Sequence, residues 1–168
     1  MNRHHAYAAT SLGELLLVAH GDDLVGIYFP DHRYPPRAES LGERVEPADV
    51  SVLEETARQL GEYLGGSRTH FDLPLKTAAD EFSESVWQIL RTLSFGQTTT
   101  YGAIATTLGN PHLAQRVGWA VGHNPLSIVV PCHRVVGANG SLTGFAGGLE
   151  RKRALLELEG SVSMDRLF

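Results

Sequence analysis

The hydrophobic pattern of this chain changes near Thr77, and that change constrains its fold more than any other feature. Before this point, short β-rich apolar runs at 14–19 and 24–29 precede one helical segment. Beyond it, almost every periodic segment is helical. We therefore expect an α+β fold, with a small α/β domain over residues 1–76 and a mainly helical domain over residues 77–168.

Local signals define the elements of the first domain. His20-Gly21-Asp22-Asp23 joins the two apolar runs and predicts a hairpin. Residues 31–47 contain two successive prolines and are expected to form a surface loop. A helix is expected from Ser51, where SVLE has the form of a capping box, to Gly65-Gly66. The alternation in HFDLPL, residues 70–75, predicts an edge strand.

Helices dominate the first part of the second domain. FSESVWQILRTL has one apolar face, and Asp80 is its expected N-cap. Thr99 or Thr100 caps the short helix YGAIATTLG, and a further helix covers residues 112–122. The turn at Gly109-Asn110-Pro111 gives these two helices the outline of a helix-turn-helix. Helical pairs that do not bind DNA share this pattern.

The last part of the chain combines a strand, a loop and a helix. IVVPCHRVV, residues 128–136, predicts a strand that is broken at Pro131. Residues 137–148 are rich in glycine but match no phosphate-binding spacing, so they predict a turn-rich loop. LERKRALLELEG predicts a final helix that ends at Gly160.

The net charge of −5 lies entirely in the first half of the chain. Residues 1–78 contain 12 acidic and 7 basic side chains, whereas residues 79–168 contain 7 of each. A neutral second half that includes Arg116, Arg134 and the run Arg151-Lys152-Arg153 offers a modest basic face for nucleic acid. A mixed, solvated surface fits the charge pattern equally well.

Composition also limits the functional classes. No segment approaches the ~20 apolar residues needed to cross a bilayer, and the N-terminus lacks the apolar core of a signal peptide, so no membrane role is expected. A single cysteine forms no intrachain disulfide, and no zinc-binding pattern is present. The sequence thus predicts a cytoplasmic protein without a metal.

The single cysteine, Cys132, lies between Pro131 and His133. A lone cysteine is most often an inert core residue that packs as a small hydrophobe. Pro131 and the flanking valines would also hold the thiol on a rigid element, as a nucleophile requires. On an extended chain His133 points away from its neighbour, so a bridging water is the more plausible route between them. The residues alone leave both readings open.

The second half of the sequence closely resembles the methylated-DNA–protein-cysteine methyltransferases, also called O6-alkylguanine-DNA alkyltransferases. The resemblance rests on TTTYGAIATTLGNP, HNPLSIVV and PCHRVVGANGSLTGFAGGLERKRALLELEG. SLGELLLVAHGDDLVGIYFP resembles the N-terminal ribonuclease-H-like domain of the same family. The family pattern implies that the C-terminal domain is winged-helix-like.

This resemblance implies direct repair of O6-alkylguanine, and of O4-alkylthymine, by irreversible transfer of the alkyl group to Cys132 after nucleotide flipping. Each molecule acts once, as a monomer and without a cofactor. His133 would take the Cys132 proton through a water, and Glu159 would orient His133. Asn124 would tie the backbone between the helix-turn-helix and the cysteine.

The resemblance also implies residues that contact the substrate and the DNA. Tyr101 would donate its hydroxyl to N3 of the flipped guanine, while Val135 and neighbouring carbonyls would read its exocyclic amine. The helix 112–122 would enter the minor groove of double-stranded DNA. Phe145 and Ala146 would complete the base pocket, and the DNA contacts would come from Thr100, Gly102, Ala114, Gln115, Arg116, Gly118 and Arg134.

Two positions depart from the family pattern. Phe145 stands where the family usually has tyrosine, so a pocket wall is kept and a hydroxyl is lost. The intercalating arginine is displaced, because Gln115 occupies its usual place and Arg116 follows one residue later. We expect Arg116 to be the intercalating residue if the helix is locally rewound, and Gln115 otherwise; the first is slightly favoured.

Two other functional classes remain to be weighed. Alkyltransferase-like proteins bind the lesion without repairing it, and they carry another residue at the cysteine position, which Cys132 argues against. A cysteine hydrolase using Cys132 and His133 would need a turnover step and an oxyanion site, and no sequence feature suggests either.

Overall fold

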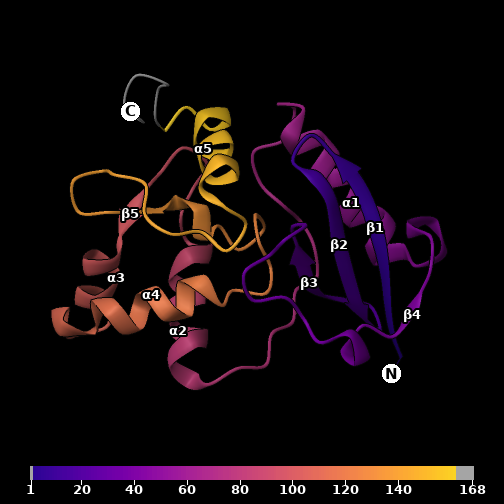
Figure 1. Cartoon of the computed structure of the whole chain (residues 1–168), viewed down its shortest axis with the longest axis horizontal. Coiled ribbons are helices and arrows are strands. Elements are labelled where there is room, and N and C mark those ends of the chain that lie inside the picture. Colours follow the sequence, from indigo (N-terminus) through magenta and orange to yellow (C-terminus); the bar gives the residue numbers. More distant parts are fainter. Residues whose placement is uncertain (1, 162–168) are drawn as a thin grey trace. The chain divides into compact units, whose positions relative to one another are not determined.

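The computed structural model describes residues 2–161. The chain divides into two compact units, and the division falls between Thr77 and Ala78. The first unit is built on a sheet and the second is mainly helical (Figure 1). The α+β fold expected from the sequence is confirmed.

A four-stranded sheet forms the centre of the first unit. Its strands lie in the order β3-β2-β1-β4; β2 pairs antiparallel with β1 and with β3, and β1 pairs parallel with β4. The predicted hairpin is confirmed by β2 and β3. The strands are β1 (Arg3–Thr10), β2 (Gly13–His20), β3 (Asp23–Tyr28) and β4 (Glu43–Arg44).

One long helix, α1 (Ser51–Leu64), packs on this sheet. Leu53 and Leu60 on the helix are fully buried, as are Leu15 and Leu17 on β2. The helix ends at the predicted place, where Gly66 takes a φ of +88 that glycine adopts without strain. Burial of this apolar face is the main source of stability for the unit.

The structure of the first unit differs from the sequence-based expectations at several places. Ser51 does not cap α1, because it is the first helical residue; the capping box belongs instead to Glu46 and Asp49, at the short 3-10 helix Pro47–Asp49. Residues 31–47 are not all loop, since they also contain β4 and the 3-10 helix Ala38–Ser40. β1 was not expected from the sequence, because its polar histidines hide the strand pattern.

Residues 70–75 form no strand. Only Leu75 makes a bridge, to Leu24. The side chain of Gln59 instead holds the segment: its Nε2 donates to the carbonyl of Asp72 at 3.0 Å, and its Oε1 accepts from the amide of Asp72 at 2.9 Å. A buried side-chain amide thus replaces a neighbouring strand as the backbone partner.

In the described part of the second unit, four α-helices and a two-stranded sheet are the main elements. Asp80 and Thr100 cap their helices as predicted, by accepting from the amides of Ser83 and Ala103. The helices are α2 (Glu81–Arg91), α3 (Tyr101–Thr107), α4 (Ala114–Gly122) and α5 (Leu149–Leu158), and the parallel strands are β5 (Thr99–Thr100) and β6 (Val135–Val136).

Helix α4 lies between its neighbours α2 and α3. Trp87 of α2 is buried, and its Nε1 donates to the carbonyl of Ala120 at 2.8 Å. The connection from α3 to α4 turns at Gly109, whose φ is +97, and continues through the 3-10 helix Pro111–Leu113. These contacts give α4 one buried face and leave the opposite face exposed.

The strand predicted over residues 128–136 is mostly absent. Ile128 has a φ of +73, and Cys132–Arg134 form a 3-10 helix. Only β6 pairs, with β5. The run of β-branched residues is buried in the core rather than paired in a sheet, so its composition reflects burial and not strand pairing.

Candidate active site

The thiol of Cys132 lies in a tight turn of the second unit. Cys132 is 5% exposed, and its amide donates to the carbonyl of Val130 at 2.8 Å. Burial raises the pKa of the Cys132 thiol, while the Asn124 side chain and the charge of Lys152 act in the opposite direction. A neutral thiol of this kind needs a base to become a nucleophile.

Asn124 fixes the chain that leads to this turn. It follows α4 and is 3% exposed. Its Nδ2 donates to the carbonyl of Val130 at 2.8 Å, and its Oδ1 accepts from the amide of Leu126 at 3.0 Å. One side chain thus joins the end of α4 to the residues just before Cys132.

His133 is fully buried beside Cys132 in sequence, and its Nε2 lies 2.8 Å from Oε2 of Glu159. Burial lowers the pKa of His133, and the hydrogen bond and charge of Glu159 oppose this shift. A carboxylate accepts and does not donate, so Nε2 carries the hydrogen. Within residues 2–161, Nδ1 of His133 has no hydrogen-bond partner from the protein. The ring therefore offers a lone pair and can act as a base.

Within residues 2–161, the Glu159 carboxylate accepts four hydrogen bonds, which come from two separate segments of the chain. Arg134 donates to it twice, from Nε to Oε1 and from Nη2 to Oε2, each at 2.8 Å. The amide of Gly96 donates to Oε1 at 3.2 Å, and His133 supplies the fourth bond. Buried carboxylates persist when they are paired and hydrogen-bonded in this way.

The expectation that Arg134 contacts DNA does not agree with its position. Arg134 is only 6% exposed. Its guanidinium is held by Glu159 and by the carbonyl of Leu93, to which Nη1 donates at 2.7 Å. Arg134 therefore supports the carboxylate that orients His133, and it lies too deep to reach a phosphate.

Lys152 is a residue of the site that sequence reasoning missed, having placed it on a basic surface. It is fully buried in α5, and its Nζ donates to the carbonyls of Thr143 and Gly144 at 3.0 and 3.4 Å. Burial lowers the pKa of Lys152 to about 8, and the charge of Cys132 opposes the shift. Its helical spacing to Leu155 and Leu156 is the signal that predicts burial.

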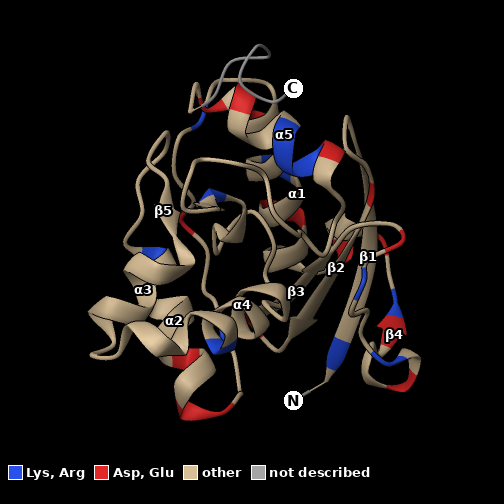
Figure 2. Ribbon diagram, turned by 60° about the vertical axis from the view of Figure 1, so that its left-hand side comes forward, with Lys and Arg blue, Asp and Glu red and all other residues tan. Residues whose placement is uncertain are grey.

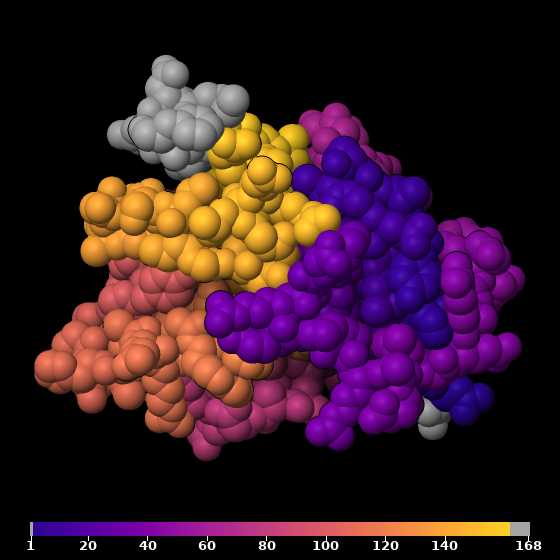
Figure 3. All heavy atoms as spheres, viewed as in Figure 1, coloured from indigo at the N-terminus to yellow at the C-terminus, as the bar shows by residue number. Residues whose placement is uncertain are grey.

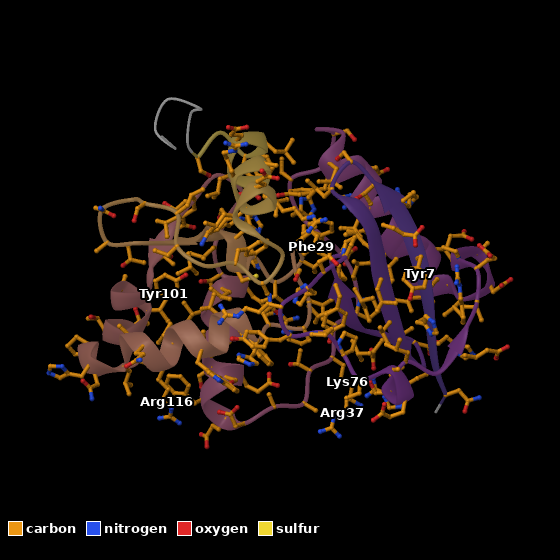
Figure 4. The ribbon with its side chains drawn as sticks, in the orientation of Figure 1. Tyr7, Phe29, Arg37, Lys76, Tyr101 and Arg116 are labelled. Carbon is orange, nitrogen blue, oxygen red and sulfur yellow. The ribbon has the colours of Figure 1, made fainter. Side chains whose placement is uncertain are left out.

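Tyr101 begins α3 and faces both the glycine-rich loop and α4 (Figure 4). Its hydroxyl accepts a hydrogen bond from Oγ1 of Thr143 at 3.0 Å, so its own hydrogen remains for another acceptor. A methyl group added at Gly118 would lie 3.7 Å from the Tyr101 ring, so the ring packs against the backbone of α4. Burial raises the pKa of Tyr101, which keeps the phenol protonated.

The other expected pocket residues lie on β6 and in the loop that follows it. Val135 is fully buried and pairs with Thr99, while Phe145 and Ala146 are partly exposed. Amino acids 138–141 of the loop are exposed, and Figure 3 shows the loop in orange to yellow on the surface of its unit. Thr100 and Gly102, at the start of α3, are also accessible from solvent.

Gln115 and Arg116 are both exposed on α4 but point in different directions. The guanidinium of Arg116 lies over the Phe82 ring of α2, 4.0 Å from its centroid. Hydrogen bonds from Ser83 lower the pKa of Asp80, and the nearby charge of Arg116 adds to this shift.

The helix itself shows no rewinding between the two positions. α4 is regular from Ala114 to Gly122, so Gln115 is one turn before Gly118 and shares its side of the helix. Ala114 also lies partly exposed at the first turn. The slight preference for Arg116 as the intercalating residue is therefore not supported.

Charge is sparse around this site. Helices α3 and α4 contain no acidic residue and a single basic one, Arg116. Figure 2 shows these helices largely in tan, whereas α5 carries blue and red side by side.

Among residues 2–161, no group of three or more His, Cys, Asp or Glu side chains is placed to hold a metal ion. No helix in this part of the chain is long and apolar enough to cross a membrane.

A thiol beside a histidine that a buried carboxylate orients is the arrangement of a protein that uses cysteine as a nucleophile. Residues 4–77 match the ribonuclease-like domain of 6-O-methylguanine DNA methyltransferase, and residues 81–161 match the DNA binding domain of the same protein. The chain belongs to the methylated-DNA–protein-cysteine methyltransferase family.

Relatives of similar length support this assignment. The methylated-DNA–protein-cysteine methyltransferase of Mycobacterium bovis is 40% identical over 94% of this chain and 93% of its own length. That of Haemophilus influenzae is 36% identical over 93% and 86%. The crystal structure of Mycobacterium tuberculosis OGT in complex with DNA superposes with a TM-score of 0.86, at 40% identity over 94% of this chain and 93% of that one.

Proposed function

We propose that this protein repairs O6-alkylguanine, and also O4-alkylthymine, in duplex DNA by moving the alkyl group onto Cys132. One observation carries the proposal: Cys132 directly precedes a buried histidine whose free Nδ1 is the only ring nitrogen left to accept its proton. The DNA-bound structure of a relative supports a DNA substrate.

The proposed reaction begins with transfer of the Cys132 proton to Nδ1 of His133 through a water molecule. Sγ attacks the alkyl carbon, so the S–C bond forms as the C–O6 bond breaks. The electron pair of that bond stays with the guanine, and the Tyr101 hydroxyl stabilises the developing negative charge by donating to N3. Glu159 stabilises the positive charge on His133.

The product explains why each molecule acts once. A thioether has no good leaving group, so the site contains no route back to the free thiol. The three hydrogen bonds from Arg134 and Gly96 hold Glu159 in place as the charge partner of His133. The protein is therefore consumed in equal amount to the lesions that it repairs.

The buried position of Cys132 implies that the damaged nucleotide leaves the duplex to reach it. Helix α4 would enter the minor groove, because Ala114 and Gly118 allow close approach. Gln115 lies on the side of α4 that faces Tyr101, so we assign it the place beside the flipped nucleotide. Val135, Phe145 and Ala146 would surround the base.

The test is the intact mass of the protein after incubation with a duplex that contains O6-methylguanine. We expect one methyl group per molecule, located on Cys132 by peptide mapping, and no further turnover with excess lesion. Repeated turnover would indicate a hydrolase, and binding without an adduct would indicate a lesion-binding protein that does not repair.

Cys132→Ala is the matched control. It should abolish transfer and retain binding to the alkylated duplex, because the thiol supplies chemistry and not docking. Demethylation of the lesion by this variant would overturn the assignment of the nucleophile.

A further inference from the structure

Helix α4 exposes a tryptophan that the proposed reaction does not use. Trp119 is 57% exposed, although it is among the largest apolar side chains of the protein. In the described part of the second unit, the other large exposed apolar side chain is Leu149, at 48%. An exposed aromatic residue of this size on a binding helix marks a contact surface more often than a scattered surface apolar residue does.

The indole of Trp119 is held in place by His123. The two rings stack with centroids 3.8 Å apart and an interplanar angle of 20°. Nδ1 of His123 also donates to the carbonyl of Trp119 at 2.7 Å, which fixes the imidazole against the helix. One face of the indole is therefore covered, and the side chain is pre-organised before any partner arrives.

Its position on α4 places Trp119 on the surface assigned to DNA. Trp119 is four residues after Gln115, so the two side chains lie on nearly the same side of the helix. It also directly follows Gly118, against which Tyr101 packs. No acidic residue of α4 would repel phosphates, but only Arg116 would attract them, and Arg116 lies on Phe82. A helix with so little charge needs another source of affinity.

We propose that Trp119, braced by His123, contacts duplex DNA directly through the sugars and base edges of the minor groove and supplies the apolar part of the affinity. The proposal rests on the function proposed above. In a duplex the base faces are covered by neighbouring bases, so the indole would pack on sugars and base edges, and contacts with the sugars carry no sequence information. Such a contact releases no counterions, so its contribution does not depend on salt.

Fluorescence tests the contact, because the chain has two tryptophans in different surroundings. Trp87 is buried, whereas Trp119 is exposed. Titration with an undamaged duplex should quench the emission of the wild type and protect it from iodide. Trp119→Phe, in which Trp87 alone reports, should show little of either change. Equal responses from the two proteins would overturn the proposal.

Affinity gives an independent measurement. Trp119→Ala should weaken duplex binding by about tenfold, the scale of loss when one large aromatic contact is truncated at an interface, and should leave the salt dependence of binding unchanged. Trp119→Phe should retain most of the affinity. Leu149→Ala removes a similarly exposed apolar side chain from α5 and should bind as the wild type does.

The same proteins separate this proposal from the repair function. Trp119→Ala should still react with free O6-benzylguanine at the wild-type rate, which also shows that it is folded. If the wild type formed no adduct with alkylated duplex, the repair function would fail. If the adduct formed and Trp119→Ala bound DNA normally, only the role of Trp119 would be refuted.

Discussion

At the scale of single residues, the site depends on Glu159, which acts through its neighbours. It holds His133 in the tautomer that leaves Nδ1 free, and it neutralises the buried guanidinium of Arg134. Because both partners are buried, a change at Glu159 affects chemistry and stability together.

Glu159→Gln should slow methyl transfer by about 10²–10⁴-fold, the range for a general base that loses its charge partner, and should weaken DNA binding far less. Single-turnover rates and binding constants for an alkylated duplex measure the two effects. Equal loss of both would point to a purely structural role. Arg134→Met with Glu159 intact is a useful comparison, because it removes the support of the carboxylate and leaves the His133 contact.

Lys152 gives a pH dependence of stability whose sign is fixed by its lowered pKa. Between pH 8 and 10.5 the Lys152 side chain keeps its proton in the unfolded chain but has lost it in the folded protein. Lys152 therefore makes the free energy of unfolding increase as pH rises through this range. The shift corresponds to roughly 3 kcal/mol, an upper limit for this residue.

We expect Lys152→Met to lack this gain. Urea unfolding of both proteins at pH 7 and pH 10 measures the free energy of unfolding. Between these two pH values, this free energy should rise more for the wild type than for the variant. A constant difference between the two proteins would mean that Lys152 keeps its ordinary pKa in the folded state.

At the scale of secondary-structure elements, the proposed mechanism leaves α4 to determine which side chain would stand beside the flipped nucleotide. Gln115→Ala should reduce transfer from duplex DNA more than Arg116→Ala does, because Gln115 lies on the Tyr101 side of the helix and Arg116 packs on Phe82. Neither variant should change the reaction with free O6-benzylguanine, which needs no flipping. A larger defect in Arg116→Ala on duplex would show that its side chain leaves Phe82 when DNA binds.

Elements with local signals were predictable from the sequence. Asp80 and Thr100 cap helices through their own side chains, and Gly66 ends α1 through its own backbone, so each signal and its result lie within a few residues. The 3-10 turn at Cys132 was not predictable, because the apolar run that precedes it fits a buried strand and a buried irregular segment equally well.

In the candidate site, too, the features with local sequence signals were predictable and those that depend on distant residues were not. Cys132 and His133 stand together in the sequence, and the family resemblance points to Glu159. The burial of Arg134 and Lys152 depends on partners far along the chain: Leu93 and Glu159 for the arginine, and the loop carbonyl of Thr143 for the lysine. A charged residue gives no sequence signal of such distant partners, so both were expected at the surface.

At the scale of the whole molecule, the distribution of charge predicts how DNA binding responds to salt. The chain has a net charge of −5, and burial removes Arg134 and Lys152 from the set of available cations. Few phosphates can then be neutralised, so the logarithm of the binding constant should fall with the logarithm of salt with a slope of magnitude below about 5. Fluorescence anisotropy over a salt series measures this slope, and a value near that of a strongly basic repressor, about −10, would reveal a basic surface that these residues do not account for.

The hydrogen bonds from Gly96, His133 and Arg134 to Glu159 also depend on the order in which the chain is made. Cys132 and His133 are synthesised before Glu159, which follows the last turn of α5. A nascent chain that has reached residue 150 therefore already contains its nucleophile, but it has no carboxylate to orient the base or to neutralise Arg134. The proposed relay of Cys132, His133 and Glu159 is complete only when the end of α5 has folded back onto the segments that contain Gly96 and Arg134, so we expect a chain that stops before Glu159 to transfer the alkyl group slowly, as Glu159→Gln does.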